Sequence, residues 1–171
     1  MAAAASLAQI VPVLLGLPFV AFAPDVPVQP NFDVKRFEGD WFAIAVVGKE
    51  APIREISVHK YSVTAKRHTG ISIFFSSLEG GDCIRFLDGY HEHGQPGIYA
   101  NNLGEVADFI VVQTDYDTYA VVLLNTDQLQ LFSRKHRGNS EMWKIFDDVA
   151  AANGFPVEKI YYPVLEKTCY D

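Results

Sequence analysis

Basic side chains are scarce in this chain. Its 171 residues include 14 lysines and arginines against 21 aspartates and glutamates, so the formal net charge at pH 7 is -7. The sequence also contains no run rich in lysine or arginine. Nucleic acids and anionic membrane surfaces are bound by clustered basic residues, and the composition therefore argues against both as partners.

Charge is missing altogether from the first residues, Met1–Ala23. An apolar run, Ile10–Phe22, lies within them, and Ala21-Phe22-Ala23 resembles a signal-peptidase cleavage site. Two prolines interrupt the run, which is shorter than the roughly 20 apolar residues of a membrane-spanning helix. We therefore expect a secretory signal peptide at residues 1–23, a single folded domain at residues 24–171, an extracellular location and no stable membrane insertion. A membrane span is the weaker alternative.

A β pattern dominates the chain from residue 40 to residue 135. Short runs rich in valine, isoleucine, tyrosine, phenylalanine and threonine alternate with turn residues. Because several gaps are short, consecutive strands should be antiparallel neighbours, and closure into a barrel would remove unpaired edges. The expected fold class is all-β, an eight-stranded antiparallel up-and-down barrel with one C-terminal α-helix packed outside. The expected strands are Asp40–Val47, Ile56–Ala65, Gly70–Leu78, Cys83–His91, Gly97–Ala100, Ala107–Gln113, Thr118–Leu124 and Gln128–Arg134.

The helix is expected at Ser140–Ala152, where the periodicity changes from β to helical. Met142, Phe146 and Val149 fall on one stripe of this segment. Asn139 or Ser140 can cap its start, and a glycine follows its end. Such a stripe is usually a packing surface, so we expect it to lie against the outside of the barrel. Two shorter elements are also expected, a helical turn at Asn31–Phe37 and a final short strand at Lys159–Tyr162.

Three short motifs follow one another along the chain. Gly39-Asp40-Trp41 opens the first strand, Thr114-Asp115-Tyr116 lies between the sixth and seventh strands, and Arg134 ends the eighth. Together they resemble the signatures of the lipocalin family. The resemblance implies an eight-stranded barrel in which Trp41 lies across the closed end and Arg134 packs on it as a structural pair. It also implies a cavity that holds one small apolar molecule.

The chain has only two cysteines, Cys83 and Cys169. An even count in a secreted chain suggests a disulfide, and the resemblance implies the same pairing, from the fourth strand to the C-terminal segment. Closing so long a loop stabilises a fold by about 4 to 5 kcal/mol in the chain-entropy treatment. Two free thiols are the alternative.

The resemblance also sets which residues face the cavity. Side chains along a barrel strand alternate between inside and outside, and the phase is counted from the three motifs and from Cys83. The expected ligand-binding residues are Ala43, Ala45, Val47, His59, Tyr61, Ile73, Phe75, Phe86, Asp88, Phe109, Val111, Val122, Leu124, Gln128, Gln130 and Phe132. Ile71, Tyr90 and Ala120 are expected to point inward beside them.

The phase of the second strand is left open by this counting. One choice turns inward His59, Tyr61 and Val63. The opposite choice turns inward Ile56, Val58 and Lys60. The first choice is the preferred one.

An interior that is mostly apolar and aromatic, with a few polar groups, is typical of a small-molecule pocket. Burying about 300 Å² of apolar ligand surface contributes about 7 to 8 kcal/mol, and association costs at least about 4 kcal/mol. Shape alone therefore supports weak to micromolar binding. The sequence predicts a secreted, non-enzymatic carrier of a small lipophilic molecule (an odorant, pheromone, retinoid, fatty acid or similar). It predicts no cofactor, and a cell-surface receptor is a candidate partner.

Other functions are weaker alternatives. Prostaglandin isomerases of the lipocalin family use a cysteine on the second strand, and Ile56–Ala65 contains none. Siderophore-binding members use three cations, and the matching positions here are not cationic. His91 and His93 share a strand face, but no third ligand is identifiable and no metal site is expected. A secreted protein that acts mainly through protein partners, or as a nutrient, is the remaining alternative.

Overall fold

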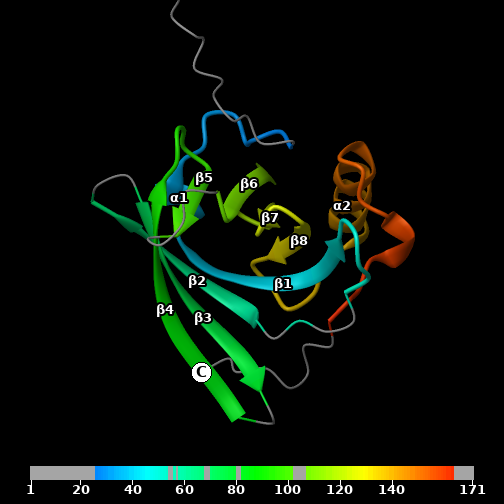
Figure 1. Cartoon of the computed structure of the whole chain (residues 1–171), viewed down its shortest axis with the longest axis horizontal. Helices are drawn as coiled ribbons and strands as arrows, with labels where there is room; N and C mark the ends of the chain where they lie inside the picture. Colours follow the sequence, from blue (N-terminus) through cyan, green and yellow to red (C-terminus); the bar gives the residue numbers. More distant parts are fainter. Residues whose placement is uncertain are drawn as a thin grey trace, which may run out of the picture.

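Eight antiparallel strands pair in sequence order and close into a barrel (Figure 1). This arrangement confirms the fold class predicted from the sequence. The alternation of apolar and polar residues and the turns between the runs suffice to place every strand to within a few residues. The strands are β1 (Gly39–Gly48), β2 (Val58–Lys66), β3 (Gly70–Glu79), β4 (Asp82–Glu92), β5 (Ile98–Asn101), β6 (Phe109–Thr114), β7 (Tyr119–Leu124) and β8 (Gln128–Ser133).

The computed structural model describes residues 26–53, 56, 58–67, 70–79, 82–101 and 107–163. The predicted signal peptide and Cys169 lie outside these ranges. Cys83 lies on β4, as expected, and its pairing with Cys169 stays a prediction. No helix in the described part of the chain has the length and apolar character needed to cross a membrane.

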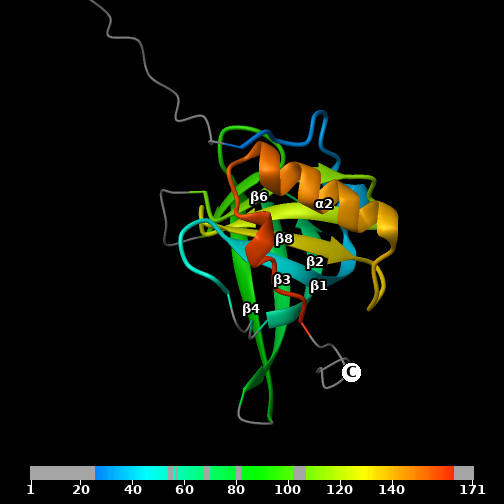
Figure 2. The same cartoon turned by 90° about the vertical axis from the view of Figure 1, so that its right-hand side faces the viewer.

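In the described part of the chain two α-helices accompany the barrel, and a side chain caps the start of each. Asp33 caps α1 (Val34–Phe37), and Asn139 caps α2 (Ser140–Ala152). These side-chain oxygens accept hydrogen bonds from N–H groups that have no partner within the helix. Figure 2 shows α2 lying across the outer face of the barrel. Its buried residues are Met142, Phe146 and Ala150, which confirms the predicted packing of the helix outside the barrel.

The last predicted element is wrong. In place of a strand at Lys159–Tyr162, the chain forms a short 3-10 helix, η1 (Val157–Lys159), and then a single bridge to β1. In that bridge, Val46 and Tyr161 exchange two backbone hydrogen bonds of 2.9 and 2.8 Å. Prolines flank the segment on both sides, and a proline cannot donate to a longer ladder.

A β-bulge in β1 changes which residues face the interior. The register of β1 against β8 shifts between Ala43 and Ala45. Ala43 and Val46 belong to the buried cluster inside the barrel, whereas Ala45 and Val47 belong to the cluster that includes the buried face of α2. The predicted inward placement of Ala45 and Val47 is therefore wrong. A bulge adds one residue to the strand and moves every later side chain to the opposite face.

A second bulge determines the phase of β2. The register of β2 against β3 shifts between Val58 and Lys60. After the shift Tyr61 and Val63 are buried in the interior, as the preferred phase predicts. Before the shift Ile56 and Val58 join the same cluster, as the opposite phase predicts. Each phase is thus correct on one side of the bulge.

The closed end of the barrel is built around Trp41. Its indole is fully buried, and the indole N–H donates to the carbonyl of Phe37 at 2.9 Å. The Arg134 guanidinium lies 3.5 Å from the centre of the indole ring. It also donates to three backbone carbonyls, in α1, at the start of β1 and in the β6–β7 turn. The contact expected between Trp41 and Arg134 is present, and the guanidinium joins three segments of the chain.

The turn between β6 and β7 is organised by the carboxylate of Asp115. This group accepts hydrogen bonds from the N–H groups of Asp117, Thr118 and Tyr119, at 3.1, 2.8 and 3.0 Å, and from the Thr118 hydroxyl. Tyr116 in the same turn adopts a left-handed backbone conformation with φ of 71°, which L-residues rarely adopt. The carboxylate therefore stabilises a turn that is strained on its own.

Replacing Asp115 by alanine is expected to lower the free energy of unfolding by about 1 to 2 kcal/mol at pH 7, the usual cost of losing such a cap. Partial burial alone would raise the pKa of Asp115, but hydrogen bonds from Thr118, Tyr119 and Asp117 outweigh it and lower the pKa below its ordinary value. Because the unfolded carboxyl has a pKa of about 3.9, this stabilisation is fully present above that pH. It is lost as the pH falls through the lower folded pKa.

Urea unfolding at a series of pH values from neutral to strongly acidic measures this effect. The difference between the natural chain and Asp115→Ala should be constant above about pH 4.5 and shrink below it. Asp117→Ala is the matched control, because the Asp117 side chain is 83% exposed and makes only a 3.8 Å ion pair with Arg36. An equal loss in both variants, or a difference that persists in strong acid, contradicts the prediction.

Candidate functional site

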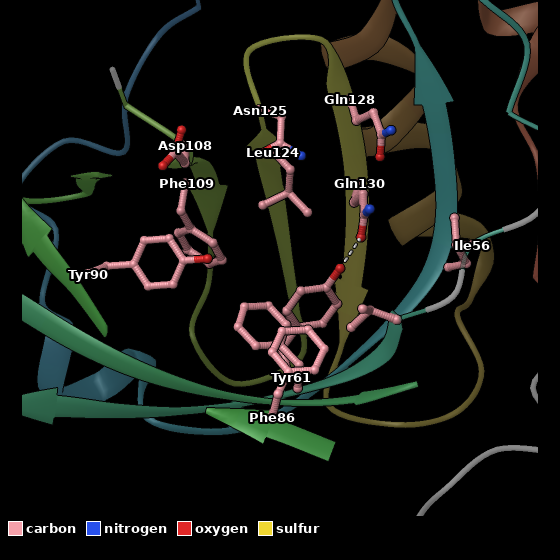
Figure 3. Close-up of a pocket in the computed structure, with 12 residues that line it drawn as sticks. Ile56, Tyr61, Phe86, Tyr90, Asp108, Phe109, Leu124, Asn125, Gln128 and Gln130 are labelled. Atoms are coloured by element: carbon pink, nitrogen blue, oxygen red, sulfur yellow. Dashed lines mark hydrogen bonds between the residues drawn. The ribbon is translucent and has the colours of Figure 1, made fainter. Parts of the chain in front are cut away.

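A cavity of about 380 Å³ lies inside the barrel (Figure 3). It reaches the β7–β8 turn, whereas Trp41 lies near the β6–β7 turn at the other end, where Arg134 contacts both. Residues of β2, β3, β4, β6, β7 and β8 contribute to it. Its polar rim comes from the start of β6 and the turn between β7 and β8, and its floor comes from the middle of β2, β3 and β8. The described residues that line it are Ile56, Val58, Tyr61, Phe75, Phe86, Tyr90, Asp108, Phe109, Leu124, Asn125, Gln128 and Gln130.

Part of the set predicted from the sequence comes together at this cavity. The predicted residues that line it are Tyr61, Phe75, Phe86, Phe109, Leu124, Gln128 and Gln130. Others belong to the buried cluster inside the barrel but do not line the cavity: Ala43, Ile73, Val111, Val122 and Phe132. Ligand contact by any of these residues remains a prediction.

The rest of the predicted set lies elsewhere. Ala45 and Val47 pack with the α2 cluster because of the bulge in β1. Asp88 is half-buried on β4, where its carboxylate accepts a hydrogen bond of 2.7 Å from the N–H of Gly89, and it does not line the cavity. The side chain of His59 lies outside the described residues.

Two polar residues of the rim, Asp108 and Asn125, were not predicted. Both stand just beyond the end of a strand, where counting inward and outward positions stops. Asp108 precedes β6, and its Oδ2 accepts a hydrogen bond of 3.1 Å from the N–H of Asn101. Asn125 begins the β7–β8 turn with φ of 49°, a conformation that asparagine tolerates better than most residues. Their positions in the sequence could have identified them. Because β6 and β7 are antiparallel, the start of β6 and the end of β7 lie at the same end of the barrel.

Aromatic rings form the apolar wall. Phe75 stacks on Phe86 with ring centres 4.7 Å apart, and meets Tyr61 edge-on at 5.4 Å. Rings in such contacts stabilise each other beyond simple burial, so the side chains of the wall support one another. Phe86 is nevertheless 45% exposed. The strand β5 pairs with β4 only from Tyr90 to Glu92, and this leaves Phe86 uncovered on that side.

A buried polar pair lies at the floor. The Tyr61 hydroxyl donates to Oε1 of Gln130 at 3.2 Å, and both side chains are 3% exposed. Burial raises the pKa of Tyr61 far above its ordinary value, so its hydroxyl stays protonated. The side-chain Nε2 of Gln130 makes no hydrogen bond to any described residue. An unpaired amide of this kind is costly to bury, and a polar atom of a ligand, or water, can satisfy it.

Comparison with known proteins agrees with this geometry. A model of the lipocalin / cytosolic fatty-acid binding protein family matches residues 38–167. Protein AMBP of Pleuronectes platessa is 26% identical over 136 residues, and the match spans 71% of this chain but only 38% of AMBP. Apolipoprotein D of Cavia porcellus is 24% identical over 151 residues, with 80% and 79% covered. Prostaglandin-H2 D-isomerase of Ovis aries is 26% identical over 167 residues, with 87% of both covered.

Proposed function

This chain belongs to the lipocalin / cytosolic fatty-acid binding protein family, and we propose that it binds and carries a small hydrophobic molecule in the barrel cavity. The observation that carries the proposal is the cavity of about 380 Å³ with its aromatic wall and its buried Tyr61–Gln130 pair. A few polar groups within a mostly apolar pocket orient a ligand whose affinity comes from buried surface. Micromolar affinity is expected from about 300 Å² of apolar contact.

Catalysis is the weaker candidate, although prostaglandin-H2 D-isomerase is among the relatives. Nucleophilic catalysis needs a group with a lowered pKa or an adjacent base. The chain has two cysteines, and Cys83, the one that the structure describes, does not line the cavity. Among the described residues that line the cavity, those with a hydroxyl group are Tyr61 and Tyr90. Burial raises the pKa of both, that of Tyr90 to about 12, so neither is an activated nucleophile.

Leu124→Trp is expected to abolish stabilisation by lipophilic ligands, because the larger ring fills the space that Leu124 lines. The matched control is Leu87→Trp, the same exchange at a side chain that is 67% exposed on β4. Thermal unfolding is measured with and without retinol, decan-1-ol, a steroid and an odorant. A ligand at 100 times its Kd stabilises by about 2.7 kcal/mol, which is readily detected as a shift in Tm.

The proposal predicts that at least one lipophile raises the Tm of the natural chain and of Leu87→Trp, and none raises that of Leu124→Trp. A natural chain that responds to no lipophile contradicts carriage. Equal responses in both variants show that the ligand binds outside the cavity.

We also propose that the protein is secreted, with cleavage after Ala23 and a Cys83–Cys169 disulfide in the mature domain at residues 24–171. The support is the uncharged apolar leader, the even number of cysteines and the place of Cys83 on β4.

A further inference from the structure

We propose that the cavity takes a lipophile whose polar head is an alcohol or a protonated amine, and that it discriminates against carboxylates. The inference deepens the proposed carrier function and rests on it. The fold and the apolar wall select for a lipophilic ligand. They do not select for the charge of its head group.

The described lining of the cavity carries negative charge and no positive charge. Asp108 is the one formally charged side chain in it, and no lysine, arginine or histidine among the described residues lines the cavity. Figure 3 places Asp108 with Asn125 and Gln128 on one side of the cavity, toward the top of the view, and the rings of Tyr61 and Phe86 at the bottom. The polar head of a ligand therefore meets an acidic rim or a neutral floor.

The Asp108 carboxylate has one oxygen that can accept a hydrogen bond from a ligand. Its Oδ2 accepts from the N–H of Asn101, while its Oδ1 accepts no hydrogen bond from a described residue. An acceptor with a free oxygen binds a group that donates, such as a hydroxyl or an ammonium. Burial, and then the nearby carboxylates of Asp88 and Asp108, raise the pKa of Tyr90, which also lines the cavity, to about 12. The same negative field acts on any charged head placed there.

A carboxylate head is costly to bury in this cavity. An ionised carboxylate that leaves water needs an opposite charge as well as hydrogen bonds to offset its desolvation. The Gln130 amide and the Tyr61 hydroxyl supply neutral donors only, and Asp108 adds repulsion. An alcohol carries no such penalty, and an ammonium gains an ion pair with Asp108.

Three ligands with the same ten-carbon chain test the inference: decan-1-ol, decan-1-amine and decanoic acid. Isothermal titration calorimetry at neutral pH gives the three Kd values for the natural chain. The alcohol and the amine are expected to bind at least about tenfold more tightly than the acid, since one charge repulsion of about 1.4 kcal/mol already accounts for tenfold.

Two substitutions in the rim locate the effect. Asp108→Asn keeps a side-chain oxygen that can accept from the Asn101 N–H. In this variant the affinity for the amine should fall relative to that for the alcohol. The ratio between the Kd of the acid and the Kd of the alcohol should become smaller. In Gln128→Lys, which adds a cation to the lining, the acid should bind more tightly and the amine more weakly. Asp117→Asn is the matched control, since that acid is 83% exposed at the other end of the barrel, and it should leave all three ratios unchanged.

The outcomes separate this inference from carriage itself. If none of the three ligands binds and no lipophile in the wider panel shifts the Tm, both proposals fail. If decanoic acid binds as tightly as decan-1-ol, the inference is overturned while carriage stands. If Asp108→Asn leaves every ratio as in the natural chain, the discrimination does not come from Asp108 and its assignment is overturned.

Discussion

Replacing Trp41 by alanine is expected to lower the free energy of unfolding by about 3 to 5 kcal/mol, the usual cost of emptying a large buried aromatic site. The indole is fully buried, and its ring centre lies 4.9 Å from that of Phe37. Its removal leaves a cavity at the closed end and takes the indole N–H from the Phe37 carbonyl. Urea unfolding followed by circular dichroism measures the loss without relying on indole fluorescence.

Trp143→Ala is the matched control, because Trp143 is the second tryptophan of the chain. It lies half-buried on α2, outside the barrel, where its ring meets that of Tyr162 at 5.4 Å. The surface it buries is smaller and the site can refill with water, so its loss should cost about half as much or less. A loss from Trp143→Ala that equals that from Trp41→Ala contradicts the role given to Trp41.

Arg134→Lys separates shape from charge at the same site. Lysine keeps the positive charge but lacks the planar fork that covers the indole and donates to three carbonyls. The expected loss is about 1 to 2 kcal/mol. In the Trp41→Ala background the same exchange should cost less, because its stacking partner is already gone. Equal costs in both backgrounds show that the two side chains act independently.

The strands were predictable from the sequence because the information that specifies them is local. Alternation within each run and the turn residues between runs place β1 to β8 correctly. The bulges were not predictable. The extra residue between Ala43 and Ala45 is visible only in the register against β8, and two small alanines give no sign of it. Because of this one extra residue, Val47 points outward toward α2 and not into the cavity as expected.

The rim of the cavity was missed for a different physical reason. A rule that alternates inward and outward positions applies only inside strands, and Asp108 and Asn125 stand just outside them. The same rule assumes that every side chain that points inward is buried. Phe86 points inward but stays exposed because β5 is short. The wall of the barrel could be predicted, whereas the polar groups that select a ligand depend on how the strands end.

Cys169→Ser is expected to lower the free energy of unfolding by about 4 to 5 kcal/mol if the proposed disulfide to Cys83 forms. The bond would close a loop of about half the chain, and the loss of chain entropy on closing such a loop destabilises the unfolded state. Among the described residues, the segment after α2 pairs with β1 through one bridge, between Val46 and Tyr161, and Phe155 packs in the apolar cluster beneath α2. The disulfide would add a covalent attachment, to β4. A net stability of 5 to 15 kcal/mol is usual for a domain, so the loss is large.

The secreted chain itself provides the first measurement. Its intact mass should correspond to a start at Pro24 and should rise by two hydrogens on reduction. Cys83→Ser, Cys169→Ser and the double variant should all unfold at the same lowered urea concentration, because each breaks the same bond and the second substitution removes nothing further. Additive losses would mean that the two thiols act separately. A mass that does not change on reduction would contradict the pairing directly, because a chain with two thiols has no bond to reduce.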